Sequence, residues 1–405
     1  MEDKQTTIDL VAGLDLGNGY VKAVINNQLL VYPSVAVKYY SNQAESKLGA
    51  ADVPYFVEHI FDTMDVSFNS PLVRDTARRF LGHRALNSGL PLEEFDVFGN
   101  KGKADVDLSG VLALGGLAAQ ALKYYYDANH TLPSDRLTLR VKLATALPIG
   151  EFKRNHNDYR NRYLNGGQPH TVTFYNFEQL ITIDFVFEAV YVSNEGESAQ
   201  YGLMTSTDEF LAYVAKEAVK RYPDDSLNDI TGRELVSASH TLGIDIGEGT
   251  IDFAVFTDGR FNADASSNVN IGFGEVLENS LELAQMKGSK YKSRKHLCEF
   301  VYKTPEMLTR AKHKVVTGIV RDEAYKFAQQ VSLAISKVYD RVGGDTQVIF
   351  VYGGGASLLE DALYPLIASA ISTDDMGQSA PIVYLNSEYS RYLNVQGLHQ
   401  LATRI

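Results

Sequence analysis

The chain has 405 residues, of which 45% are apolar and 22% charged, and its formal net charge is −12. This composition is typical of a globular protein large enough for two substantial cores, and the negative charge argues against direct, non-specific DNA binding. The single cysteine, Cys298, excludes an intramolecular disulfide and any zinc cluster built from cysteines. Because residues 1–5 are polar and no apolar stretch approaches the ~20 residues that span a bilayer, we expect a cytoplasmic protein without a membrane anchor.

A short glycine-rich turn lies near the start of the chain. Residues 15–22 read Asp-Leu-Gly-Asn-Gly-Tyr-Val-Lys between the apolar runs 10–14 and 21–25, which predicts a strand, a turn and a strand. Glycines let the backbone approach a ligand closely, and the N–H groups of such a turn can point inward as a phosphate cradle. The opening carboxylate, Asp15, stands where a magnesium ion on that phosphate needs an oxygen or a bound water.

Residues 38–105 lose this regularity and gain charged and turn residues, so we interpret them as a variable insert on the first domain. Short apolar runs at 55–57 and 79–82 are candidate strands within this insert. After it, Ser109 is expected to cap a buried helix over residues 110–126.

The next segment leads to two glutamates beside a glycine. Residues 137–146 are predicted to form a strand that closes at a Leu-Pro pair, and residues 172–192 read as a β-hairpin. Glu195 and Glu197 follow this sheet, and either carboxylate can orient a water molecule, although both are also ordinary turn residues. Of the two we favour Glu195, because it follows the strand more directly.

A near-copy of the first turn occurs in the second half of the chain. Residues 245–252 read Asp-Ile-Gly-Glu-Gly-Thr-Ile-Asp, again between two apolar runs. One such turn is more often an ordinary hairpin than a site, but two suggest a duplicated domain that closes on one nucleotide from both sides. A third turn, residues 353–355, is a triple glycine between a buried-strand pattern and a helix, where a base or ribose can lie against bare backbone.

Three further features complete the second half. Gly272 precedes a predicted helix over residues 276–286, whose N-terminus is another candidate phosphate site. The lysines and arginines of residues 289–320 are interpreted as a solvated face rather than a binding site. Residues 321–341 are predicted to form a long amphipathic helix.

The order of these motifs resembles that of the actin, sugar-kinase and chaperone-ATPase superfamily, and residues 15–22 are similar to the first phosphate loop of actin. Within the superfamily the resemblance is to the ParM-like actins of bacterial plasmid segregation. It rests on residues 143–152 (LATALPIGEF), 281–291 (LELAQMKGSKY), 351–356 (VYGGGA) and 392–398 (YLNVQGL).

This resemblance implies an α/β fold of the actin-like type, with two duplicated α/β domains around a central nucleotide cleft. Domain I would span residues 1–192 and include the insert, and domain II would span residues 193–385. A C-terminal helix over residues 386–405 would then return to domain I.

The resemblance also implies a site for ATP or GTP with Mg²⁺. Asp15 and Asp245 would bind the magnesium ion, mainly through water, and Asp245 would serve hydrolysis together with Glu195, whose rival is Glu197. The nucleotide would be bound by Gly17, Asn18, Gly19, Lys22, Gly247, Glu248, Gly249, Thr250, Gly272, Gly353, Gly354 and Gly355.

The activity implied by the resemblance is nucleotide hydrolysis coupled to polymerisation. The chain would form dynamic filaments with itself and segregate plasmid DNA only indirectly, through a small DNA-binding adaptor of the ParR type, without contact with a membrane. The alternative is a sugar or small-metabolite kinase, which would share all three glycine turns and add a substrate-binding aspartate. No distinctive substrate cluster is visible in the sequence.

Overall fold

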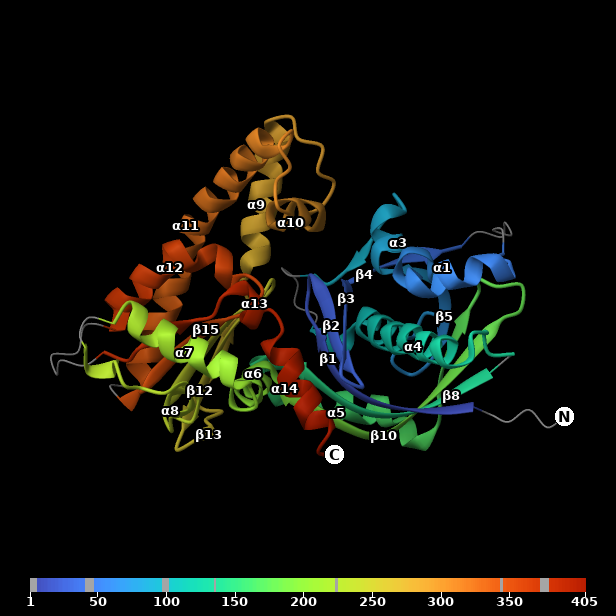
Figure 1. Cartoon of the computed structure of the whole chain (residues 1–405), viewed down its shortest axis with the longest axis horizontal. Coiled ribbons are helices and arrows are strands. Elements are labelled where there is room, and N and C mark those ends of the chain that lie inside the picture. The colour runs from blue at the N-terminus through green and yellow to red at the C-terminus, as the bar shows by residue number, and fades with distance from the viewer. Residues whose placement is uncertain are drawn as a thin grey trace.

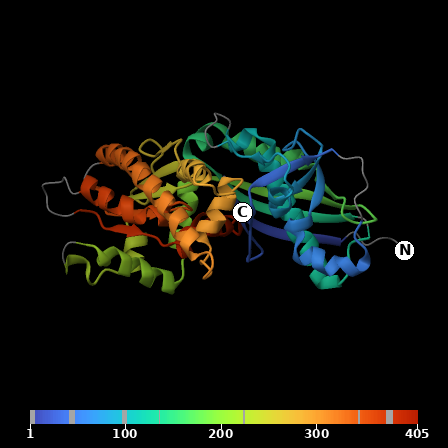
Figure 2. The ribbon, with the colours of Figure 1, turned by 90° about the horizontal axis from the view of Figure 1, so that it is seen from above.

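The computed structural model describes residues 6–40, 47–96, 102–134, 136–222, 225–342, 345–371 and 379–405. These residues fold into two halves, each built on its own β-sheet and covered by helices (Figure 1). Viewed from above, the two halves lie side by side along the longest axis of the molecule (Figure 2). Over the described ranges, no helix is both long and apolar enough to cross a membrane.

The first half contains a ten-stranded sheet in the order β3-β2-β1-β8-β10-β9-β5-β6-β4-β7. Its central strands β1, β8 and β10 run parallel, whereas β2 and β3 are antiparallel additions at one side. The strands are β1 (Thr6–Leu16), β2 (Tyr20–Ile25), β3 (Gln28–Pro33), β4 (Val35–Tyr39), β5 (Asp65–Asn69), β6 (Arg78–Leu81), β7 (Glu93–Glu94), β8 (Arg136–Leu147), β9 (His170–Phe174) and β10 (Ile181–Asn194).

The second half repeats the core of this arrangement. Its sheet follows the order β13-β12-β11-β15-β16, with β14 paired to β12, and β11, β15 and β16 run parallel. This order matches β3-β2-β1-β8-β10 strand for strand, so the duplication predicted from the two glycine turns extends to five strands in each half. The strands are β11 (Thr241–Ile246), β12 (Ile251–Thr257), β13 (Arg260–Phe261), β14 (Ser267–Val269), β15 (Val348–Tyr352) and β16 (Ile382–Tyr384).

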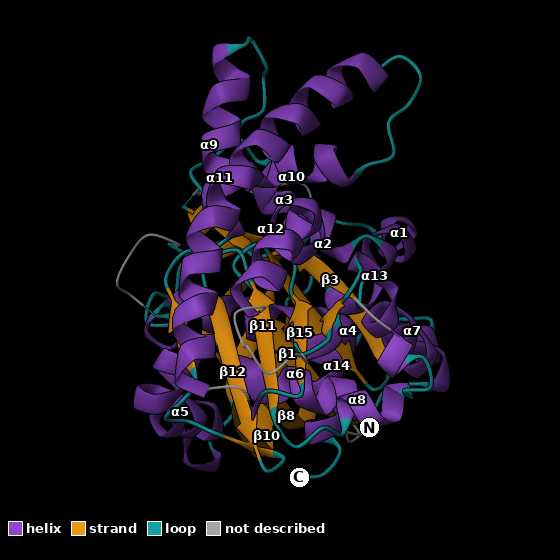
Figure 3. Ribbon diagram, turned by 90° about the vertical axis from the view of Figure 1, so that its left-hand side faces the viewer, coloured by secondary structure: helices purple, strands orange, loops and turns teal. Residues whose placement is uncertain are grey.

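Helices cover both sheets, and α9 and α11 extend well beyond the strands of the second half (Figure 3). The helices of the first half are α1 (Val53–Glu58), α2 (Ile60–Thr63), α3 (Gly82–Asn87), α4 (Asp107–Asn129) and α5 (Ile149–Leu164). Those after it are α6 (Glu195–Met204), α7 (Asp208–Lys220), α8 (Gly232–Val236), α9 (Phe273–Met286), α10 (Arg294–Tyr302), α11 (Arg310–Val342), α12 (Ala356–Ile371), α13 (Ser387–Ser390) and α14 (Leu393–Ala402).

The described part of residues 38–105 is integral to the first sheet, which corrects its interpretation as an irregular insert. Strand β5 pairs with β9, and β6 joins β5 to β4, so this segment carries the sheet on beyond the duplicated five strands. The apolar run 55–57 lies in helix α1 rather than in a strand, and Phe56 and Val57 point into the first core. The run 79–82 forms β6 as expected.

Two helix boundaries also differ from expectation. Helix α4 begins at Asp107, and Ser109 lies inside it, where its hydroxyl donates to the Lys103 carbonyl instead of capping the helix. Its residues 108–122 are all buried, because this stretch has no charged residue to place in water. Helix α11 begins at Arg310, so part of the basic run belongs to the long helix.

Two helices, α6 and α14, lie where the two halves meet (Figure 1). Leu398, Leu401 and Ala402 of α14 pack against Ala144 and Ala146 of β8. Helices α6 and α14 cross so closely that a Cβ added at Gly397 would lie 1.8 Å from the Ser198 carbonyl oxygen. Any side chain at that position would therefore separate the two helices.

Candidate functional site

A cleft of about 650 Å³ lies between the two halves and is lined by residues from both. The volume suits a small ligand of nucleotide size. The structure brings nearly all of the sequence-predicted site residues to its walls: Asp15, Gly17, Asn18, Gly19, Lys22, Glu195, Asp245, Gly247, Glu248, Gly249, Thr250, Gly353, Gly354 and Gly355.

The two glycine turns are antiparallel hairpins of the same register. Asp15 pairs with Lys22 across the first hairpin, and Asp245 pairs with Asp252 across the second. The hairpins face each other closely, since a Cβ at Gly19 would lie 2.1 Å from the Glu248 carboxylate. A side chain at position 19 would therefore have to displace the end of the Glu248 side chain.

The first hairpin carries its own counter-charge. The Lys22 ammonium lies 3.1 Å from the Asp15 carboxylate, and both side chains are largely buried at the cleft wall. The lysine predicted to contact phosphate is therefore already present beside the carboxylate that opens the turn.

In the second hairpin the residue opposite the opening Asp245 is another carboxylate, Asp252, and the nearby cation Arg294 pairs with Glu248 instead, at 3.6 Å. Burial, and then the nearby Glu195 carboxylate, raise the pKa of Asp245 to about 7, and the Asn394 amide that donates to Asp245 at 2.7 Å only partly offsets this. Asp252 is buried behind it and accepts hydrogen bonds from the Ile149 N–H at 2.9 Å and the Thr250 hydroxyl at 3.0 Å. Burial raises the pKa of Asp252 as well, so the ionised forms of both carboxylates are disfavoured here until a cation compensates their charge.

This charge distribution fits a magnesium ion held mainly through water and phosphate. No three acidic, histidine or cysteine residues of the described ranges converge as direct ligands. Magnesium is commonly held by one or two carboxylates together with waters and substrate phosphates. The Asp15 and Asp245 carboxylates at the cleft wall supply that pair. A divalent cation would offset the burial and the repulsion from Glu195 that raise the pKa of Asp245.

The third turn brings backbone to the same cleft. Gly353 has φ +103°, and a Cβ there would lie 2.3 Å from an Asp245 carboxylate oxygen. A side chain at this position is excluded both by the left-handed backbone and by the contact. Open space surrounds the position of a Cβ on Gly354, so its bare backbone faces the cleft.

Gly272 lies behind the second hairpin and is not among the lining residues, which differs from the expectation that it contacts the nucleotide. Its Cβ would meet the Glu248 carbonyl oxygen at 2.2 Å. The first N–H groups of α9, on Phe273 and Gly274, donate to the carbonyls of Gly247 and Glu248 at 2.9 and 2.8 Å. The N-terminus of α9 therefore supports the turn instead of receiving phosphate itself.

The two candidate glutamates point to different places. Glu195 is the first residue of α6 and lines the cleft, where its carboxylate accepts a hydrogen bond from the Lys103 ammonium at 2.9 Å. Glu197 is not a lining residue; its carboxylate accepts from the hydroxyls of Ser193 and Tyr191, at 3.2 and 3.4 Å. The geometry places only Glu195 where it can act on a ligand in the cleft.

Several lining residues were not found from the sequence. Lys103 lies in the segment interpreted as an insert, and no local pattern marks it, because its partner Glu195 is 92 residues away. Arg294 and Lys295 were assigned to a solvated face, yet both line the cleft and are largely buried. One Arg294 guanidinium nitrogen lies 3.6 Å from the Glu248 carboxylate and has no hydrogen-bond partner among the described residues, so it remains a buried donor for an anionic ligand.

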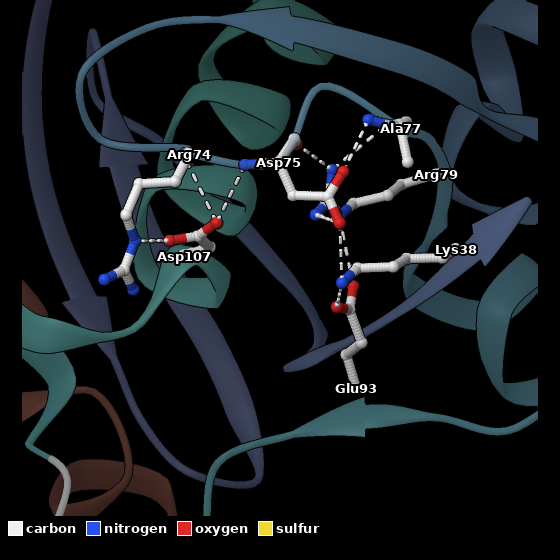
Figure 4. A network of polar contacts seen from close by, with 7 residues as sticks. All are labelled: Lys38, Arg74, Asp75, Ala77, Arg79, Glu93 and Asp107. Atoms are coloured by element: carbon white, nitrogen blue, oxygen red, sulfur yellow. Dashed lines mark hydrogen bonds and ion pairs between the residues drawn. The ribbon is translucent and has the colours of Figure 1, made fainter.

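Lys295 also forms a contact between the halves at this wall of the cleft, because its ammonium pairs with Glu94 on strand β7. A network of ion pairs around the buried Arg79 holds β7 in place (Figure 4). The fully buried Arg79 donates to Glu93 at 3.1 Å, and Lys38 lies 3.2 Å from Glu93 and 2.8 Å from Asp75. The short edge strand is thereby fixed by ion pairs, although it has only two residues.

Family models support the class that this fold and cleft define. The model of actin-like protein N-terminal domains matches residues 13–196, and that of the C-terminal domain of archaeal MreB-like actin homologues matches residues 243–364. The chain therefore has the actin-like fold, and each of its halves matches a model of an actin-like protein family.

Solved structures agree over nearly the whole chain. The actin-like protein Alp7A matches with a TM-score of 0.65 and 16% identity, covering 98% of this chain and 97% of its own. ParM of Bacillus thuringiensis in its structure with ATP matches with a TM-score of 0.57 and 17% identity, covering 99% of each chain. An archaeal actin homologue gives a TM-score of 0.57 at 16% identity, with 98% and 99% covered. No protein with curated annotation matches by sequence.

Proposed function

We propose that this chain is an ATPase of the ParM-like actins, which assembles into nucleotide-dependent filaments and segregates plasmid DNA. One observation carries the proposal: two hairpins of the same register, each opened by an aspartate, face each other across one cleft of nucleotide size. The solved structures of B. thuringiensis ParM with ATP, ADP and AMPPNP support a nucleotide as the ligand of this fold.

The proposed chemistry is transfer of the terminal phosphoryl group to water. That reaction needs positioning and charge neutralisation more than covalent help from the protein. The turns that contain Gly17, Gly19 and Gly249 would direct backbone N–H groups to the phosphates, with Lys22 beside them. Glu195 would accept a hydrogen bond from the attacking water and orient it.

A magnesium ion would supply positive charge at the phosphates when bound. Asp15 and Asp245 would hold it through coordinated water, on the side of the cleft where the ionised carboxylates of the second hairpin need a compensating cation. GTP is the alternative nucleotide in the proposal.

The cellular role follows from the resemblance to ParM. Filaments of this chain would assemble in the cytoplasm of a bacterium and reach plasmid DNA through a small basic adaptor of the ParR type. The formal net charge of −12 supports an adaptor, because direct contact with DNA would be repulsive.

The decisive experiment is light scattering of purified protein with Mg²⁺ and ATP or GTP, followed by the same measurement with the diphosphate. Filaments should appear with the triphosphate at micromolar protein, and should disassemble as phosphate is released. A protein that remains monomeric in negative stain with every nucleotide, while it phosphorylates a sugar or another metabolite, would replace this proposal with the kinase alternative.

A further inference from the structure

Lys103 is a buried cation in the cleft that none of the glycine turns supplies. Its ammonium lies 2.9 Å from the Glu195 carboxylate, and only 11% of each side chain is exposed. Burial lowers the pKa of Lys103, but the carboxylates of Glu195, Asp15 and Glu151 outweigh burial and raise it above its usual value. The ammonium is therefore charged at neutral pH, within the same cleft as both hairpins.

Several hydrogen bonds fix the backbone around Lys103, whereas its ammonium is held through its contact with Glu195. The N–H groups of Lys103 and Ala104 both donate to the Glu151 carboxylate, at 3.0 and 2.6 Å. The Ser109 hydroxyl donates to the Lys103 carbonyl at 2.5 Å, and a Cβ at Gly102 would lie 2.3 Å from a Glu151 oxygen. A fixed backbone with a flexible four-carbon stem lets a compact charge move between two acceptors a short distance apart.

Among the described residues, the one hydrogen bond from the Lys103 side chain goes to Glu195, the residue proposed to orient water. A carboxylate held by an ammonium has fewer lone pairs free to accept from a water molecule. A terminal phosphate in the cleft would offer Lys103 a second anionic acceptor. The geometry thus links the occupation of the phosphate site to the freedom of Glu195.

We propose that Lys103 senses the terminal phosphate of the bound nucleotide, an inference that rests on the proposed function. Without a triphosphate, its ammonium holds the Glu195 carboxylate. With a triphosphate, the ammonium donates to a terminal phosphate oxygen, and Glu195 becomes free to accept from water. Lys103 therefore sets the preference for triphosphate over diphosphate, in addition to keeping Glu195 inactive in the empty cleft.

The test compares the affinities of Lys103→Met and the wild type for ADP and for the non-hydrolysable analogue AMPPNP, each with Mg²⁺, by isothermal titration calorimetry. The variant should lose ~10-fold or more in AMPPNP affinity, since it loses a charge-assisted hydrogen bond, whereas ADP affinity should change by less than about twofold because ADP lacks the terminal phosphate. Equal losses for both ligands, or none for either, would show that Lys103 is only a counter-ion and would overturn the inference.

A matched control is Lys326→Met. Lys326 also pairs with a buried glutamate, Glu323 at 2.6 Å, but it lies on α11 and is not a lining residue of the cleft. Its loss should leave both affinities unchanged. A loss of AMPPNP preference in this control would mean that removing any such lysine has the effect, which would also overturn the inference.

A second pair of variants covers the case in which Lys103→Met fails to fold with Glu195 left unpaired. In the Glu195→Gln background the carboxylate that pairs with the Lys103 ammonium is gone, and adding Lys103→Met should still reduce AMPPNP affinity selectively. No selective loss in this background would overturn the inference. A wild-type chain that binds neither AMPPNP nor ADP would instead contradict the proposed function itself, so the two failures are distinct.

Discussion

The two glycine hairpins have the same backbone and opposite electrostatics. In both, an aspartate opens the turn and the residue seven positions later returns opposite it: Lys22 faces Asp15, and Asp252 faces Asp245. The first hairpin is thus locally neutral, whereas the second places two buried carboxylates across from each other. The two hairpins therefore share a backbone but differ in charge, because the residue on the returning strand is Lys22 in the first and Asp252 in the second.

This asymmetry determines which side of the cleft needs a cation. Lys22 already supplies a positive charge to the first hairpin, so an added divalent ion relieves more repulsion at the second. The third turn shows the same divergence. In the second half β15 ends in the triple glycine 353–355, whereas its equivalent β8 ends at Leu147 and runs through a proline into α5. At this third position, bare backbone faces the cleft only from the second half, at residues 353–355.

The largest expected effect comes from Glu195, which belongs to α6 and to neither hairpin. Glu195→Gln should reduce nucleotide turnover by about 10²- to 10⁴-fold, the range of general acid–base contributions, and leave ADP affinity nearly unchanged. Phosphate release and ADP titration measure the two quantities. Glu197→Gln is the matched control, because Glu197 turns away from the cleft toward Tyr191 and Ser193. Equal turnover in the wild type and Glu195→Gln would remove Glu195 from the mechanism.

The next prediction tests the charge difference between the hairpins through stability. A folded-state pKa of about 7 for Asp245, against 3.8 for an ordinary aspartate, means that the folded state favours the protonated carboxyl. This contribution is fully present below pH ~4 and is lost as the pH rises toward 7, by roughly 4 kcal/mol in all. Asp245→Asn should remove this pH dependence. The free energy of unfolding of the variant, relative to the wild type, should therefore increase as the pH rises.

Urea unfolding between pH 4.5 and 8, in EDTA and without nucleotide, measures this difference between Asp245→Asn and the wild type. Asp15→Asn is the counterpart in the first hairpin. It should keep the larger part of the pH dependence, since burial and Glu195 raise the pKa of Asp245 more than Asp15 does. A constant difference between the wild type and Asp245→Asn over this range would contradict the raised pKa of Asp245 at the second hairpin.

The hairpins were predictable from sequence because each is written in eight consecutive residues. Strand, turn and strand at both places followed from them, since local glycine and apolar patterns specify these elements. The actin-like fold followed from the order of the motifs and their resemblance to actin-like proteins. Lys103 and the pairing of Lys295 with Glu94 were not predictable, because these contacts join residues far apart in the chain. In the segment 38–105 an apolar run predicted β6, whereas β7 was not predictable, because it consists of two glutamates whose ion pairs join residues far apart in the chain.

A third prediction concerns the two residues that distinguish the hairpins. Lys22→Met should weaken ADP and AMPPNP binding alike, by about 10- to 100-fold, as expected for a lost hydrogen bond to a charged group. Asp252→Asn should change either affinity only a few-fold, because Asp252 bonds to Ile149 and Thr250 and is not a lining residue. Calorimetric titration of both variants decides the point. A selective loss of AMPPNP in Lys22→Met would transfer the role proposed for Lys103 to the first hairpin.

The smallest effects test whether the two backbones are equivalent. A Cβ at Gly17 would lie 2.7 Å from the Tyr20 carbonyl oxygen, and one at Gly247 would lie 2.9 Å from that of Thr250. Both contacts are with backbone, so Gly17→Ala and Gly247→Ala should each lower the free energy of unfolding by about 1–2 kcal/mol. The two losses should be similar. Gly318→Ala, inside helix α11 with nothing within 4 Å of the added Cβ, should instead stabilise the protein by about 0.5–1 kcal/mol. Urea unfolding of the three variants compares them directly. A large cost at one turn and none at the other would show that the shared register hides different backbone constraints.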